Sequence, residues 1–200
     1  MKATTFSALG LLPMTLASVV PREANPQILG PDGSRQIIGA INAVTSAAQS
    51  LDMTVQGINS PDLTQLLALN SGSTQIVQTI QNETSAVQSA PDINLLSALS
   101  VQLAATQLIG TLKTTLSDLV SKKPYIDQAG VSSLVVASLQ QQKSAGDVFS
   151  SALTSKVPQL VSILANIDGG IIDQLFSMAI AAFSQAPTAS AVSAMPRGTP

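Results

Sequence analysis

Aliphatic side chains recur at alternating spacings of three and four residues through most of this 200-residue chain. Such spacings place side chains on one face of an α-helix, because the helix completes a turn about every 3.6 residues. The first series predicts a helix with one buried face over residues 37–58. Its members are Ile37, Ile41, Val44, Ala48, Leu51, Val55 and Ile58.

Four further series follow, and each lies just after a proline: Pro61, Pro91, Pro124 and Pro158. Proline is tolerated in the first turn of a helix, where its missing N–H would have no partner. Ser60, Pro61 and Asp62 form the clearest start signal, with Ser60 as the expected capping residue. The second series is Leu66, Leu69, Ser73, Val77, Ile80, Thr84 and Val87. The third is Leu96, Leu99, Leu103, Thr106, Ile109, Leu112, Leu116 and Leu119.

The fourth series follows Gly130, which is expected to separate it from a short preceding turn. Its members are Val131, Val135, Leu139, Gln142, Gly146, Phe149 and Leu153. The last series, in a helix expected from Pro158 to about Gln185, is Leu160, Leu164, Ile167, Ile171, Leu175 and Met178. The far half of this last helix is apolar almost all round, which favours a central or surrounded position.

No segment alternates with period two for long enough to predict a strand. About five helices of some 25 residues joined by tight turns favour antiparallel neighbours. The sequence therefore predicts an all-α, single-domain bundle of about five antiparallel helices. Aromatic residues make up only 2% of the chain. A core built from small and aliphatic side chains leaves room for a central hydrophobic cavity.

The composition limits which ligands the chain can bind and which reactions it can catalyse. Charged residues make up 10% of the chain and the formal net charge is −2, so there is no basic surface for nucleic acid. Lys122 and Lys123 are the only adjacent pair of basic residues, and we expect them at a helix C-terminus, where positive charges complement the helix dipole. The chain has no cysteine and no histidine, which excludes His-based catalytic triads and His-ligated zinc. We therefore expect no catalytic residues, no metal and no cofactor.

The two ends of the chain differ in composition from the middle. Lys2 followed by an apolar stretch predicts a secretory signal peptide at residues 1–18, and the alternative is a buried N-terminal helix. Residues 19–32 are predicted to be a linker, and residues 33–186 are predicted to be the helical-bundle domain that binds lipid or a hydrophobic surface. Residues 187–200 are rich in Ser, Ala and Pro and are expected to form a disordered tail. A secreted, extracellular protein without a membrane-spanning segment is expected.

Three local motifs have both a structural and a functional interpretation. The segment 166–170 resembles a calcium loop only faintly, and a helix kink at its two glycines is favoured. Asp168 and Asp173 diverge by roughly 140° around a helix, which disfavours a catalytic acid pair. Asn82 begins an Asn-Glu-Thr acceptor sequence, so it is a candidate glycosylation site in a secreted protein.

Polar or small residues interrupt the apolar series, among them Ser73, Thr84, Thr106, Gln142 and Gly146. In the structural interpretation, Ser and Thr bond back to their own helix and Gln142 reaches a neighbour. In the functional interpretation, some of them meet at a cavity and bind the head group of a guest lipid. The candidate cavity-lining residues are Leu66, Ser73, Val77, Ile80, Leu99, Leu103, Thr106, Leu139, Gln142, Phe149, Leu164, Ile171 and Leu175.

The pattern from about Arg35 to Gln185 resembles the fungal hydrophobic surface-binding protein A family, which includes cell wall galactomannoproteins. Its best-marked portions are IIGAINAVTSAAQSL from Ile37, the KKPYID turn before Gln128, DVFSSALTSKVP from Asp147 and IAAF from Ile180. The resemblance implies a helical bundle that is secreted or held in the cell wall as a mannoprotein. Some members of the family bind fatty acids in a central cavity. Others adsorb to hydrophobic solids and help to recruit polyester-degrading hydrolases, and some are described as virulence factors.

Two hypotheses follow from the sequence. The preferred one is a binding module that holds a long-chain fatty acid or similar lipid between its helices. The alternative is an interfacial protein that adsorbs to hydrophobic surfaces, since its low charge leaves little repulsion against adsorption. Cell-wall polysaccharide is a further candidate partner, and an enzyme is a distant third hypothesis.

Overall fold

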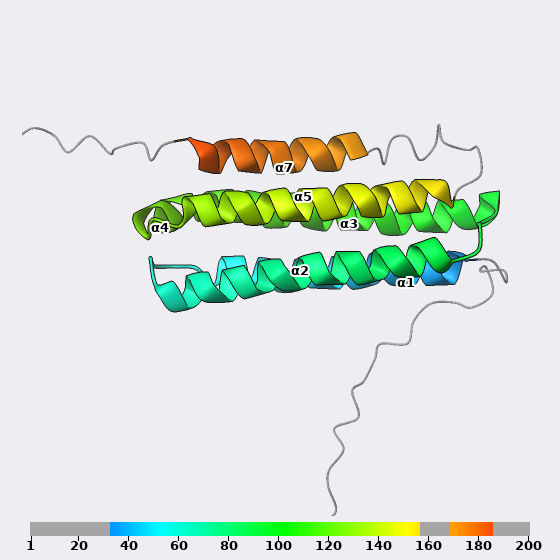
Figure 1. Cartoon of the computed structure of the whole chain (residues 1–200), viewed down its shortest axis with the longest axis horizontal. Helices are drawn as coiled ribbons and strands as arrows, with labels where there is room; N and C mark the ends of the chain where they lie inside the picture. Colours follow the sequence, from blue (N-terminus) through cyan, green and yellow to red (C-terminus); the bar gives the residue numbers. More distant parts are fainter. Residues whose placement is uncertain (1–32, 157–168, 186–200) are drawn as a thin grey trace, which may run out of the picture.

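In the computed structural model, the described residues are 33–156 and 169–185, and every regular element among them is a helix (Figure 1). The helices are α1 (Ser34–Gln56), α2 (Leu63–Ser89), α3 (Leu95–Ser121), α4 (Lys123–Gln128), α5 (Ser132–Ser155) and α7 (Gly169–Ser184). The all-α prediction is confirmed. The predicted signal peptide, linker and tail lie outside the described residues, and so does the start of the last predicted helix.

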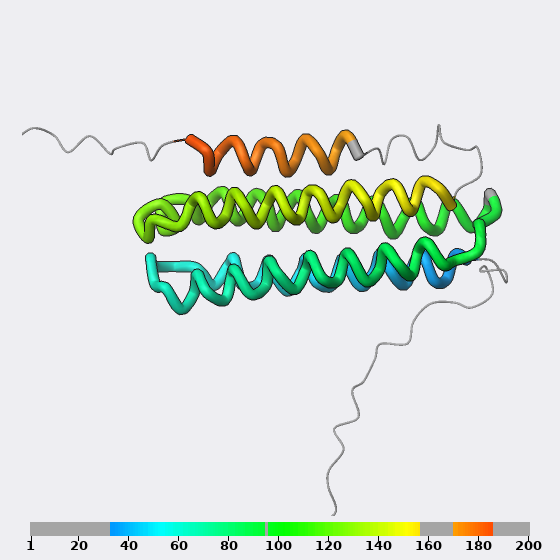
Figure 2. Tube along the Cα trace, viewed as in Figure 1, coloured from blue at the N-terminus to red at the C-terminus, as the bar shows by residue number. Residues whose placement is uncertain are grey.

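The long helices form a closed ring. Each contacts two neighbours along its length, in the order α1, α2, α5, α7, α3 and back to α1. Figure 2 shows the chain reversing direction from each long helix to the next. In the ring, α1 and α2 are antiparallel neighbours, as are α5 and α7, whereas α2 and α5, α3 and α7, and α1 and α3 run parallel. The inner faces of all these helices converge on one core.

The inner faces of α1 and α2 follow the sequence prediction closely. All seven predicted residues from Ile37 to Ile58 are buried, and Ile41, Val55 and Ile58 are fully so. On α2 the only exchange is Ile76, which is buried in place of the half-buried Val77. Burying such an aliphatic side chain contributes about 1.5–3 kcal/mol, so these faces stabilise the ring.

The first half of α3 faces the other way from the prediction. Leu96, Leu99 and Leu103 are exposed to 63%, 48% and 74%, and Thr106 is also exposed. The predicted series contains three successive steps of three residues between Leu103 and Leu112, and nine residues rotate a helix by about 180°. The series could therefore not stay on one face. The residues that do face the core are Ala98, Val101, Ala104, Ala105, Leu108, Leu112, Leu116 and Leu119.

Side-chain caps fix where α2 and α3 begin. Asp62, not the predicted Ser60, caps α2, and its carboxylate accepts a hydrogen bond of 2.9 Å from the Thr64 N–H. Asn94 caps α3 by accepting a 2.9 Å hydrogen bond from the Ser97 N–H. Both caps satisfy an N–H that has no partner within its helix. Pro124 lies in the first turn of α4, as predicted.

Two glycines are required by the backbone. A Cβ added at Gly33 would lie 2.1 Å from the Pro91 carbonyl oxygen, so the start of α1 fits closely against the α2–α3 turn. Gly130 has a φ of +73°, a conformation that side chains disfavour, and it ends the turn after α4. The prediction that Gly130 separates α5 from a short preceding element is confirmed.

Candidate functional site

Two small cavities lie inside the ring, and they share one residue, Gln142. Their volumes are about 30 Å³ and about 40 Å³. A cavity of this size holds at most a few water molecules. The closed ring therefore has an interior that is only partly filled.

The first cavity lies between α2 and α5 and reaches α1 and α3. Its wall is aliphatic with a row of neutral polar groups, and no charged side chain is among the described residues that line it. These residues are Leu51, Leu66, Leu69, Asn70, Ser73, Thr115, Leu116, Leu119, Val131, Leu134, Val135, Ser138, Leu139 and Gln142.

The second cavity is lined from all five long helices. Its wall is more uniformly apolar, with two aromatic rings, and again no described lining residue is charged. Its residues are Val44, Ile76, Ile80, Ala105, Leu108, Ile109, Leu112, Gln142, Gly146, Phe149, Ser150, Leu153, Ile172 and Phe176. A Cβ added at Gly146 would meet no other atom within 4 Å, so free space begins directly at this backbone position.

Gln142 stands out among the buried polar side chains. It is 3% exposed, and its amide, which borders the space of the cavities, makes no hydrogen bond to any residue in the ranges 33–156 and 169–185. Thr84, by contrast, donates to the Ile80 carbonyl at 2.7 Å, and Thr106 donates to the Gln102 carbonyl at 2.9 Å. The local bonding expected for threonine is therefore present, whereas Gln142 lacks the expected neighbour.

A buried amide without a partner costs about 1–3 kcal/mol. Ser73 is also buried at the first cavity and its hydroxyl makes no hydrogen bond within the described chain. Asn70 and Ser138 line the same cavity and are half-buried. The first cavity therefore offers a set of neutral donors and acceptors, and the second offers an apolar chamber.

The structure brings together only part of the predicted lining. Leu66, Ser73, Leu139 and Gln142 lie at the first cavity, and Ile80, Gln142 and Phe149 lie at the second. Val77 instead lines an open groove between α2 and α5. Leu99, Leu103 and Thr106 are on the outside of α3, as described above, so their predicted place in the lining is wrong. Leu164 lies outside the described residues.

The inward face of α7 is rotated by one residue from the prediction. Ile171 is 43% exposed and Met178 is 55% exposed, while Leu175 is half-buried against the core. The residues that reach the second cavity are Ile172 and Phe176, which are four apart. Because this helix is apolar almost all round, its periodicity is weak. It also lies in the ring with two neighbours and is not surrounded, contrary to the expectation.

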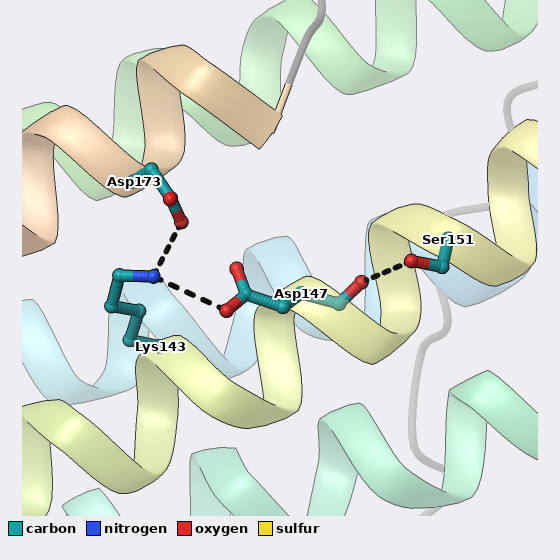
Figure 3. Close-up of polar contacts among 4 residues, drawn as sticks. All are labelled: Lys143, Asp147, Ser151 and Asp173. Carbon is teal, nitrogen blue, oxygen red and sulfur yellow. Dashed lines mark hydrogen bonds and ion pairs between the residues drawn. The ribbon is translucent and has the colours of Figure 1, made fainter.

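An ion pair joins α7 to α5. Lys143 of α5 lies between Asp147 of its own helix, at 3.2 Å, and Asp173 of α7, at 2.7 Å, and Ser151 bonds to the Asp147 carbonyl (Figure 3). The hydrogen bond from Lys143 lowers the pKa of Asp173, and the hydrogen bond to Asp173 raises the pKa of Lys143. Asp173 therefore has a structural partner.

A second contact that holds α7 lies at its other end. Lys123 forms an ion pair with Asp127 and lies 5.9 Å from the centre of the Phe183 ring. Burial raises the pKa of Asp127, but hydrogen bonds from Lys123 and Ser132 outweigh it and lower that pKa. Lys122 is the C-terminal cap of α3, as predicted. The basic pair thus holds helices together.

The other predicted features are placed as follows. Asn82 is exposed on α2, and its glycosylation stays a prediction. Asp168 and the 166–168 part of the glycine segment lie outside the described residues. Within residues 33–156 and 169–185, no cluster of acids resembles a metal site. No helix of the described chain is long and apolar enough to cross a membrane.

Comparisons with known proteins agree with this fold. Residues 34–155 match the family described as Hydrophobic surface binding protein A. The chain is 32% identical over 132 residues to cell wall mannoprotein 1 of Aspergillus flavus, covering 66% of this chain and 47% of that protein. Its counterpart in Aspergillus fumigatus is 28% identical over 135 residues. The chain spans about half the length of these relatives.

Solved structures show the same architecture. The crystal structure of Afmp4p in complex with palmitic acid has a TM-score of 0.71 and 28% identity, covering 76% of this chain and 99% of that one. Ligand binding domain 1 of the Penicillium marneffei MP1 protein, complexed with arachidonic acids, has the same TM-score at 20% identity and supports the fold alone. The family match covers more than half of the chain, and the chain belongs to the hydrophobic surface binding protein A family.

Proposed function

We propose that this chain binds a long-chain fatty acid or similar lipid inside the helical ring, without catalysing a reaction. The observation that carries the proposal is Gln142, a buried and unpartnered amide at the junction of two apolar cavities. Apolar pockets with a few placed polar groups are typical of small-molecule sites. The likeness to Afmp4p in its palmitic acid complex supports the choice of ligand.

Each cavity has a separate role in this proposal. The second cavity, with Ile80, Phe149 and Phe176, takes the acyl chain. The first cavity takes the head group, because the side chains of Ser73 and Gln142 there make no hydrogen bond within the described residues. Leu66 and Leu139 form the aliphatic wall beside the head group.

The ring must widen to admit a lipid. Ligand pockets typically measure about 300–1,000 Å³, and the two cavities measure about 30 and 40 Å³. Helix α7 is the element that can move most easily, because it has 16 residues whereas the other long helices have 23 to 27. Outward movement of Ile172 and Phe176 would enlarge the second cavity, which these residues line.

The acyl chain can drive this opening. Each buried CH₂ group contributes about 0.8 kcal/mol, so a dozen contribute roughly 10 kcal/mol. That is comparable to the cost of association, about 4–15 kcal/mol. Affinity should therefore rise with chain length until the cavity is full.

A matched pair of glycine substitutions tests the proposed location. Gly146→Leu places an aliphatic side chain in the second cavity, whereas Gly110→Leu adds the same side chain at an exposed glycine of α3 that lines neither cavity. Displacement of a fluorescent fatty acid by palmitic acid should be lost in Gly146→Leu and retained in Gly110→Leu. Retained binding in both variants, with helicity intact, would place the lipid elsewhere.

We further propose that the protein acts outside the cell, in or near the cell wall, as a glycosylated protein. The names of the two Aspergillus relatives support this location. The exposed position of Asn82 on α2 is compatible with an attached glycan. Cell-wall polysaccharide then becomes a natural neighbour of the protein.

A second candidate function is adsorption to hydrophobic surfaces, with recruitment of hydrolases to them. Leu96, Leu99 and Leu103 form an exposed aliphatic patch on α3, and residues 95–112 contain no charged side chain. Exposed apolar patches on soluble proteins often mark interaction sites. This patch lies on the outside of the ring, so adsorption and internal lipid binding are compatible.

A further inference from the structure

We infer that the lipid head group held at Gln142 is electrically neutral, so that a fatty acid is bound in its protonated form. The inference rests on the proposed function and specifies the ligand class of the same site. It follows from the chemistry of Gln142 and from the absence of any charged partner along the described walls of both cavities.

The amide of Gln142 matches a carboxylic acid better than a carboxylate. A glutamine side chain carries an NH₂ donor and a carbonyl acceptor, and a protonated carboxyl group also carries one donor and one acceptor. The two can form a pair of hydrogen bonds in which every polar atom is satisfied. An ionised carboxylate only accepts, so the Gln142 carbonyl would face a negative charge without a proton between them.

Among residues 33–156 and 169–185, no cation lines either cavity to receive a carboxylate. The charged groups on or beside the described helices are Arg35 and Asp52 on α1, Asp62 and Glu83 beside or on α2, Asp92 between α2 and α3, Lys113 and Asp118 on α3, Lys122, Lys123 and Asp127 around α4, Lys143, Asp147 and Lys156 on or beside α5, and Asp173 on α7. None of them lines either cavity.

The lysine next to Gln142 in the sequence is already engaged. Lys143 is held by Asp147 and Asp173, so reaching into the cavity would break both ion pairs. Near the first cavity, Asp52 follows the lining residue Leu51, and Gln56 donates to both Asp52 and Asp118, at 2.8 and 3.2 Å. Lys122 at that end of the ring donates to the Gln56 carbonyl at 3.2 Å and does not line the cavity.

An unpaired charge in such surroundings is strongly disfavoured, and a group that can take up a proton does so. A free carboxylic acid has a pKa of about 4.3, as in a glutamate side chain. At higher pH, binding must be preceded by protonation of the acid. The apparent dissociation constant should then rise about tenfold for each pH unit.

The experiment compares dodecanoic acid with dodecanamide, which also carries a donor beside a carbonyl acceptor and stays neutral at every pH. Dissociation constants for both are measured by calorimetry with the delipidated full chain at pH 6, 7 and 8. The acid is also labelled with ¹³C at its carboxyl carbon, whose chemical shift reports its protonation when bound. Gln142→Leu, a substitution of similar size, is measured in parallel, with circular dichroism as the folding control.

The expected result is an affinity for the acid that falls about 100-fold from pH 6 to pH 8 and an affinity for the amide that stays constant. The bound acid should give the ¹³C shift of its protonated form at pH 7. In Gln142→Leu, both ligands should bind more weakly at every pH.

An acid affinity that is flat with pH, or an ionised ¹³C shift for the bound acid, would overturn the neutral head group while leaving lipid binding intact. Unchanged binding by Gln142→Leu would overturn the role of this amide. If neither ligand binds at any pH, the proposed function itself fails, and the two failures are thereby distinguishable.

Discussion

The Nζ atom of Lys143 lies 2.7 Å from Oδ1 of Asp173 and joins α5 to α7. Three residues after each of these positions, the same two helices line the second cavity with Gly146 and Phe176. The ion pair therefore fastens the helix that must move if a lipid enters. It is partly exposed, so it can be broken without leaving a buried charge.

Asp173→Asn should loosen α7 while leaving the rest of the ring in place. The variant keeps the shape of the side chain but removes the charge that faces Lys143. Amide hydrogen exchange at pH 7 should become faster in α7 and stay unchanged in α1. Asp147→Asn is the control, because it removes the partner of Lys143 within α5 and leaves the contact to α7.

Acidification should have the same effect as Asp173→Asn. The pKa of Asp173 is lowered by Lys143, so the stabilisation is present at neutral pH and is lost as pH falls through that lowered pKa. The chain has no cysteine, so spin labels at Ser151→Cys and Ser177→Cys can report the distance between α5 and α7. A distance distribution that stays narrow down to pH 2 would contradict the prediction.

Asp52→Asn should alter the pH dependence of stability in the opposite sense. Burial, with the nearby charge of Asp118, raises the pKa of Asp52. The folded state therefore takes up this proton more readily than the unfolded state, and the contribution of Asp52 to stability improves as pH falls through its raised pKa. Urea unfolding of the variant should show equal or greater stability at pH 7, and a smaller gain on acidification than the original chain. If the variant and the original chain show the same difference in stability between pH 5 and pH 7, Asp52 does not have this role.

Gly33→Ala should destabilise the bundle, because its new Cβ would lie 2.1 Å from the Pro91 carbonyl oxygen. The expected loss is about 1–3 kcal/mol, as for other overpacked sites. Gly39→Ala is the matched control on the same helix, since its Cβ would meet nothing within 4 Å. That control should be neutral or more stable by up to about 1 kcal/mol. Equal stabilities of the two variants in urea would show that the start of α1 is not held against the α2–α3 turn.

Leu103→Ser tests the exposed patch on α3. Leu103 is 74% exposed, so the free energy of unfolding should change by less than about 0.5 kcal/mol. Adsorption to polystyrene beads should fall if the patch makes the contact. Val148→Ser is the control, because Val148 is also exposed, at 53%, but lies on α5. Equal adsorption by both variants would remove the argument for this patch.

The sequence predicted the helices well because their aliphatic spacing is regular. The series from Ile37 to Ile58 alternates threes and fours without interruption, and every member is buried. The predicted helix starts differ from the observed ones by two to four residues. Ser60, Asp62 and Asn94 are all suitable capping residues, and local geometry decides which of them caps a helix. Asp62 and Asn94 were selected.

The inward faces of α3 and α7 were harder to predict, for one shared reason. Both helices carry apolar residues on more than one side, so two series compete. On α3, Ala98, Val101 and Ala105 face the core while Leu99 and Leu103 face outward. Bulk alone favoured the leucines, but small residues can also occupy an inner face where neighbouring helices lie close.

The polar junction of the cavities was only partly foreseeable. Gln142 is conspicuous in the sequence because it interrupts an aliphatic series between Leu139 and Phe149. Its lack of a hydrogen-bond partner depends on which side chains of α2 and α7 lie opposite, and periodicity along one helix carries no information about that. The contribution of Ile172 and Phe176 was missed for the same reason.

Native mass spectrometry of the delipidated protein with palmitic acid shows whether the helical ring binds a lipid. Lipid binding inside the ring predicts an adduct of one or more palmitic acid molecules at low micromolar ligand, lost in Gly146→Leu and retained in Gly110→Leu. No adduct with the original chain at high micromolar palmitic acid would contradict the account.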